Sequence, residues 1–194
     1  MAMNRVIPAA ILALLVTACG QPQPDEASLP DKGSQDGRAP LASPSNPSGE
    51  TTAPDPQALR AEGVGEIIVG QSPPATLKRD AVQISETCVT YSDPQRRLHA
   101  ITDGNVVMRI TAMDGSSLKT ARGIAVGASE ADVREAYPDA VAQPHKYVET
   151  PAKYLDWRPG GGSSGLRFEI DRDGNVSMIH AGREPHLEYV EGCA

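Results

Sequence analysis

The chain has 194 residues, enough for one modest domain with extensions, and its formal net charge is -7. This acidic balance argues against a nucleic-acid partner, because binding to phosphates needs a basic surface. The sequence also lacks a catalytic or metal-binding motif of any specificity, so it predicts neither an active site nor a cofactor.

Residues 1–18 have the features of an export signal. Arg5 gives the start a positive charge, and residues 6–16 form an apolar run that is too short to remain in a bilayer as a spanning helix. The run ends at Val16-Thr17-Ala18-Cys19, after which the sequence becomes polar. A simple secretory signal followed by an accidental cysteine is the alternative interpretation.

The sequence around Cys19 resembles the lipobox of bacterial lipoproteins, in which small residues precede a cysteine that receives diacylglycerol before cleavage. The resemblance implies that Cys19 becomes the lipid-bearing N-terminus. Its acyl chains would then hold the protein on a membrane, since each buried methylene contributes about 0.8 kcal/mol. Gly20 stands where an Asp usually retains enterobacterial lipoproteins in the inner membrane. By this resemblance the protein belongs to the outer membrane, with its domain facing the periplasm.

Residues 19–56 are predicted to form a disordered, lipid-anchored linker. Pro, Gly, Ser, Gln, Asp and Thr dominate it, and Leu29 and Leu41 are its only apolar residues larger than Ala, apart from Cys19. Such a segment buries too little surface to offset the entropy cost of ordering. We therefore expect the linker to let the domain stand off the membrane.

Residues 57–194 are predicted to form a duplicated domain, with repeats at about 63–120 and 121–194. Both repeats contain the pattern Val-Gly-x-Ser, at 69–72 and at 126–129. In each repeat the serine is predicted to cap a short helix, because its hydroxyl can accept a hydrogen bond from an unpaired N–H of the first turn.

The surroundings of these serines support two helices. Pro73 follows Ser72, and proline is favoured at the first helical position. Ser129 precedes Asp132 by three residues, which is close to a capping box. The apolar stripe of this second helix consists of Val133, Ala136 and Tyr137. Pro138 should end the helix.

Each predicted helix is followed by a β-hairpin. Asp103-Gly104-Asn105 matches Asp173-Gly174-Asn175, and these residues favour the positive φ of tight hairpin turns. When the turns are aligned, Leu98 corresponds to Phe168, and both are predicted to be buried. Apolar and polar residues alternate in these strands. The residues predicted to face the core are Leu166, Phe168 and Ile170 in the second repeat and Val106, Met108 and Ile110 in the first.

These elements predict an α+β fold of two tandem copies, each a short helix packed on antiparallel β-hairpins. The arrangement resembles envelope lipoproteins of the BamE/SmpA-OmlA type and the β-lactamase inhibitory protein fold. There a Gly-x-Ser/Thr-x-x-Glu/Asp-Val signature opens a helix that packs on an antiparallel sheet. The matching residues here are Gly127, Ser129, Asp132 and Val133, whereas Pro73-Pro74 in the first repeat departs from the signature. The resemblance implies a binding role and transfers no functional residue.

Cys88 and Cys193 remain once Cys19 is assigned to lipid. A pair of cysteines in an exported protein is expected to form a disulfide, because that compartment is oxidising. The rival is a redox-active or metal-binding pair, but the separation lacks the Cys-x-x-Cys spacing that both usually use. We therefore predict a bridge from the first repeat to the C-terminus.

Two loops and two histidines offer weaker candidates. Residues 171–175 suggest a calcium loop, but their glycine is at the fourth place and not the sixth, and the distal glutamate of that motif is missing, which favours a plain turn. Residues 159–165 are glycine-rich but lack the lysine and helix of a phosphate loop, which favours a mobile connection. His99 aligns with the solvent-facing Glu169. His180 aligns with the core-facing Ile110 and is interpreted as a structural histidine.

The aromatic residues are concentrated in the second repeat. Strand alternation places Trp157 on the face of Leu155 and predicts it to be in the core, with Tyr154 and Arg158 on the other face. The functional alternative makes Tyr154, Trp157, Arg158 and the adjacent glycine-rich loop an aromatic recognition edge.

The resulting hypothesis is a membrane-anchored envelope lipoprotein that acts as a non-enzymatic binding module for a protein or cell-wall ligand. The alternative is a small envelope hydrolase that uses His180 or His99 with a nearby acid. An enzyme should have a deep cleft with a histidine, a carboxylate and a hydroxyl within hydrogen-bond reach, whereas a binder should have a shallow apolar edge.

Overall fold

The computed structural model describes residues 55–83 and 85–193. The predicted export signal (1–18), the lipidation site Cys19 and the predicted linker as far as residue 54 lie outside the described residues. Within the described ranges, no helix is long and apolar enough to cross a membrane.

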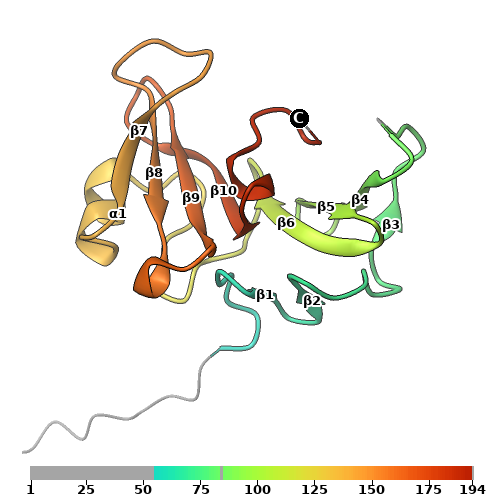
Figure 1. Ribbon diagram of the computed structural model, residues 1–194. Helices are drawn as coiled ribbons and strands as arrows, with labels where there is room; N and C mark the ends of the chain where they lie inside the picture. Colours follow the sequence, from blue (N-terminus) through green and yellow to red (C-terminus); the bar gives the residue numbers. More distant parts are fainter. Residues whose placement is uncertain (1–54, 84, 194) are drawn as a thin grey trace, which may run out of the picture. The chain divides into compact units, whose positions relative to one another are not determined.

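Most of the described chain forms one eight-stranded antiparallel sheet (Figure 1). The strand order is β3-β4-β5-β6-β10-β9-β8-β7, so that β6 and β10 form its central pair, and β1 and β2 form a separate hairpin. The strands are β1 (Gly63–Val64), β2 (Ile67–Ile68), β3 (Lys78–Arg79), β4 (Cys88–Asp93), β5 (Leu98–Asp103), β6 (Val106–Ala112), β7 (Val141–Pro144), β8 (Lys153–Trp157), β9 (Ser164–Ile170) and β10 (Val176–Arg183).

The predicted helix of the second repeat is α1 (Glu130–Ala136). Ser129 caps it through a capping box, because the Ser129 hydroxyl accepts the Asp132 N–H while the Asp132 carboxylate accepts the Ser129 N–H. The helix ends before Pro138, as predicted. The described residues also contain two 3-10 turns, η1 (Pro159–Gly161) and η2 (His186–Glu188).

The predicted helix of the first repeat does not form, so the predicted fold class of two helices on hairpins is wrong. Residues 71–77 run as turn and irregular chain into β3. Pro74 disfavours the helical conformation of the residue before it, which is Pro73. In this stretch only Leu77 is buried, so a helix here would lack an apolar stripe to pack on the sheet. The described domain is therefore mostly β, with α1 as its one α-helix.

Both predicted hairpin turns are confirmed. β5 pairs with β6 and β9 pairs with β10, each pair being antiparallel. Gly104 and Asn105 have φ of 55° and 68°, and Gly174 has φ of 80°. These are the positive values for which glycine and asparagine were expected. Leu98 and Phe168, at 1% and 0% exposed, are both buried as predicted.

Bulges in the returning strands change the faces that simple alternation predicts. In β6 the register shifts so that Val107 pairs with Thr102 and Arg109 pairs with Ile101. Val107 is therefore buried in the core, whereas Val106 and Met108 are only half-buried.

A bulge in β10 places His180 on the face of the sheet opposite to the predicted one. The register shifts between Val176 and Met178. Ile179 and Ala181 are fully buried with the core, so His180 between them points to the opposite face. The alignment of His180 with core-facing Ile110 was wrong because it assumed an unbroken alternation.

The two faces of the sheet have different covers. The apolar face packs against β1, β2, α1 and the chain that precedes α1, and the covering residues are Leu59, Val64, Ile67, Leu118, Ile124, Val133 and Tyr137. The opposite, polar face is partly covered by residues 184–193, which we call the C-terminal segment. Its turn η2 contacts β6, β9 and β10.

Candidate functional site

A row of polar side chains crosses the polar face of the sheet. The antiparallel register places His99 of β5 beside Thr111 of β6, Thr111 beside His180 of β10, and His180 beside Arg167 of β9. Asp156 of β8 continues the row beyond Arg167. Because cross-strand partners lie on the same face, five strands contribute polar groups to one line.

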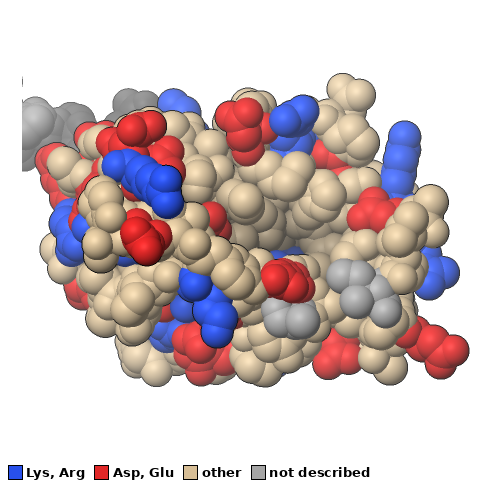
Figure 2. All heavy atoms as spheres, turned by 90° about the horizontal axis from the view of Figure 1, so that it is seen from above, with Lys and Arg blue, Asp and Glu red and all other residues tan. Residues whose placement is uncertain are grey.

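A cavity of about 300 Å³ lies over this face, between the sheet, the β7–β8 loop and the C-terminal segment. It reaches the surface, since Tyr147 and Val190 in its wall are 60% and 38% exposed. The loop and the segment are at the upper end in Figure 1, and Figure 2 shows a hollow at this end with largely uncharged borders. The other lining residues are Thr90, His99, Ala100, Ile101, Arg109, Thr111, Met113, His145, Tyr154, Glu169, Met178, His180 and Gly192.

Glu169 lies between two histidines in the wall of this cavity. His145 Nε2 is 3.1 Å from one carboxylate oxygen, and His180 Nε2 is 3.7 Å from the other. On its far side, His180 Nδ1 is 2.9 Å from the Thr111 hydroxyl. A chain of polar groups thus runs from the β7–β8 loop through β9 and β10 to β6.

The loop fixes the tautomer of the His145 ring. Its Nδ1 accepts the backbone N–H groups of Tyr147 and Val148, each at 3.1 Å. A nitrogen that accepts cannot also carry a proton, so the proton of the neutral ring is on Nε2. His145 therefore donates to Glu169 through Nε2.

The same surroundings shift two pKa values downward. The imidazole of His180 lowers the pKa of Glu169, His145 adds to this effect, and partial burial opposes it. Burial lowers the pKa of His180, the positive charges of Arg109 and Arg167 act in the same direction, and Glu169 opposes them. Glu169 is therefore ionised and His180 neutral near pH 7.

The depressed pKa of His180 predicts a loss of stability on mild acidification. Below about pH 6.5, the ordinary histidine value, the unfolded chain takes up a proton that the buried ring refuses. The free energy of unfolding should then fall by up to about 1.4 kcal/mol per pH unit from this group. His180→Gln should flatten urea-unfolding midpoints between pH 7 and 5, while the exposed His99→Gln should not. The assignment fails if both variants keep the wild-type slope. The stability that the lowered pKa of Glu169 contributes is lost at more acidic pH, below the ordinary pKa of a glutamate.

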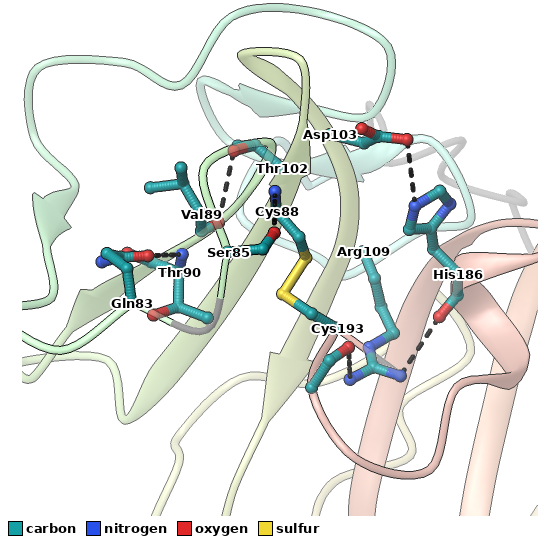
Figure 3. Close-up of a disulfide and its surroundings, with 11 residues drawn as sticks. Gln83, Ser85, Cys88, Val89, Thr90, Thr102, Asp103, Arg109, His186 and Cys193 are labelled. Carbon is teal, nitrogen blue, oxygen red and sulfur yellow. Dashed lines mark hydrogen bonds and ion pairs between the residues drawn. A yellow bond between two sulfur atoms is a disulfide. The ribbon is translucent and has the colours of Figure 1, made fainter.

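The C-terminal segment is fixed over the polar face by covalent and polar bonds (Figure 3). The predicted disulfide is confirmed, because Cys88 and Cys193 are bonded with their Cα atoms 5.9 Å apart. Arg109 of β6 is 5% exposed and donates to the backbone carbonyls of the segment. Its acceptors are the oxygens of His186 at 3.1 Å, Tyr189, and Gly192 at 3.3 Å.

Tyr154 is buried between the ring of His145 and the guanidinium of Arg167. Its ring stacks on His145 at 4.6 Å between centroids, and the Arg167 guanidinium lies 4.6 Å from the ring centre. The ring is 5% exposed, yet its hydroxyl finds no acceptor within the described part of the chain. The backbone N–H of Lys146 approaches the hydroxyl, but it is itself a donor. The hydroxyl of Tyr154, a residue that lines the cavity, is thus a buried donor without an acceptor.

No known protein family, curated protein or solved structure matches this chain.

The structure does not place Tyr154, Trp157 and Arg158 on one recognition edge. Tyr154 is on the polar face, whereas Trp157 packs against the core on the other face. The Trp157 ring contacts Tyr137 at 5.0 Å between centroids, with the guanidinium of Arg122 above it. Arg158 pairs with carboxylates of the C-terminal segment and fixes that segment instead.

Sequence reasoning missed most of the cavity wall. His145 and Tyr147 belong to a loop, where no periodicity indicates a direction. Arg109 carried a usable signal, because it alternates with Ile110 of the predicted apolar set, whereas the bulge of β6 lies before it at Met108. Glu169 and Arg167 carried a usable signal, because they alternate with Leu166, Phe168 and Ile170 along one strand.

Proposed function

We propose that this protein is a lipid-anchored module of the cell envelope that binds a ligand in the cavity on its polar face and does not transform it. The observation that carries the proposal is the hydroxyl of Tyr154, a buried donor without an acceptor among the described residues, on a residue that lines the cavity. A buried donor without an acceptor costs about 1–3 kcal/mol, and a bound ligand with an acceptor would remove that cost. The anchor at Cys19 and the location at the outer membrane rest on the resemblance to lipoproteins.

A hydrolase is the second candidate, and the chain Thr111–His180–Glu169 favours it, because it contains a hydroxyl, a histidine and a carboxylate in the order of a catalytic triad. Three features place it second. Thr111 and His180 are 8% and 7% exposed, the His180–Glu169 distance of 3.7 Å exceeds a hydrogen bond, and β6 is flanked by β5 and β10. The backbone N–H groups near Thr111 therefore point along the sheet, where they cannot form an oxyanion hole above its face.

The test fills the cavity and measures binding. Thr90 is half-buried and lines the cavity, so Thr90→Trp should occupy it. Val82→Trp adds the same ring at a position that is 82% exposed, and serves as the matched control. Membrane proteins and sacculi from the envelope are passed separately over the immobilised protein. We expect the wild type and Val82→Trp to retain a component of one of these fractions, and Thr90→Trp to retain at least tenfold less of it. Equal retention by all three, or cleavage of an envelope substrate that Thr111→Val abolishes, would refute a binding role for the cavity.

The same preparation tests the anchor. Mass spectrometry of the mature N-terminus should find an acylated Cys19, and Cys19→Ala should leave the protein unprocessed or released from membranes. An unacylated N-terminus at another residue would contradict the anchored half of the proposal.

A further inference from the structure

The ionised groups in the cavity wall balance each other. Glu169 is negative and lies between the imidazoles of His145 and His180. Arg109 is positive and donates to backbone carbonyls, but among the described residues it has no carboxylate in contact, and its buried Nε has no acceptor. Arg167 is already paired with Asp156. A ligand with a full charge would be attracted by one of Glu169 and Arg109 and repelled by the other, so it would gain little to offset the loss of its water. The cavity therefore favours a neutral ligand.

The wall has unused capacity both to donate and to accept hydrogen bonds. The Tyr154 hydroxyl has a proton and no acceptor in the described chain. Each oxygen of the Glu169 carboxylate faces one imidazole, although a carboxylate offers about four acceptor positions in all. A ligand hydroxyl suits both groups, since it accepts from one neighbour and donates to another.

Apolar side chains lie among these polar groups. Met113, Met178 and Val190 line the cavity, and the Tyr147 ring is 60% exposed at its rim. Such surfaces fit C–H faces, which a ligand must then carry beside its hydroxyls. A volume of about 300 Å³ is at the small end for ligand sites and suits a single ring.

We propose that the cavity holds one ring of a neutral sugar, with a ligand oxygen accepting from Tyr154 and a ligand hydroxyl donating to Glu169. This inference rests on the proposed binding function and names its ligand class. Sugars combine neutral charge, hydroxyls that donate and accept, and apolar C–H faces, which are the three properties that the wall selects.

The test compares two sugars that differ only at C6, where glucose has a hydroxymethyl group and glucuronic acid a carboxylate, by titration calorimetry at pH 7. We expect the wild type to bind the neutral sugar more tightly. Tyr154→Phe removes only the hydroxyl and keeps the ring between His145 and Arg167, so it should bind the neutral sugar about five- to tenfold more weakly. Its melting temperature should be unchanged or higher, because an unsatisfied buried donor is lost.

Each other outcome overturns the inference. Preference for the anionic sugar would show that Arg109 and not Tyr154 selects the ligand. An unchanged affinity in Tyr154→Phe would remove the proposed contact. If neither sugar binds, but retention of envelope components still depends on Thr90→Trp, the sugar assignment is wrong and the binding function stands. If both assays are negative, the proposed function has failed as well.

Discussion

Replacing Cys88 and Cys193 with serine should lower the free energy of unfolding by about 4 to 5 kcal/mol. The bridge joins residues separated by 105 positions, and in the chain-entropy model a closed loop of this length removes that much freedom from the unfolded chain. Urea unfolding of the oxidised wild type and of the double serine variant measures the difference. Wild type treated with a dithiol should behave as the variant does.

The folded state should change only near the end of the chain when the bridge is absent. Leu187 is fully buried, and Arg109 donates to the carbonyls of His186 and Tyr189, so these contacts remain. Residues 190–193 keep fewer bonds and form part of the cavity wall. Hydrogen exchange should therefore increase there and not in the central strands. A loss of stability below about 1 kcal/mol would contradict the entropic account.

The features that could be predicted from sequence depend on short-range chemistry or on one clear constraint. The Asp-Gly-Asn turns need positive φ, which glycine and asparagine adopt readily. The capping box at Ser129 involves four consecutive residues. The disulfide prediction followed from the expectation of export and from there being one pair of cysteines besides Cys19. Each of these predictions was confirmed because few alternatives competed with it.

The features that could not be predicted depend on register and long-range packing. Because of a bulge between Val176 and Met178, His180 lies on the polar face and not in the predicted core, and the sequence around Ser177 does not indicate this bulge. The first repeat shares Val-Gly-x-Ser with the second, yet Pro74 and the lack of an apolar stripe prevent its helix. The candidate site joins the β7–β8 loop, β6, β9 and β10, and only the strand order brings these segments together.

Asp156→Asn should destabilise the domain by about 3 to 5 kcal/mol, because it removes the two-pronged counter-charge of a buried arginine and leaves only the exposed Glu188 carboxylate, 4.0 Å away. Arg167 Nε and Nη2 are 2.7 and 2.9 Å from the two carboxylate oxygens of Asp156, and the two residues are 6% and 3% exposed. Urea unfolding at pH 7 measures the loss. The double variant Asp156→Leu, Arg167→Met removes both charges and keeps similar volumes, so it should be less destabilised than the single variant. Arg167 also donates to the Glu188 carbonyl and covers the Tyr154 ring, so the double variant should loosen the C-terminal segment even where overall stability is preserved. If Asp156→Asn costs less than about 1 kcal/mol, water reaches the pair, and the polar face is more open than its low exposure indicates.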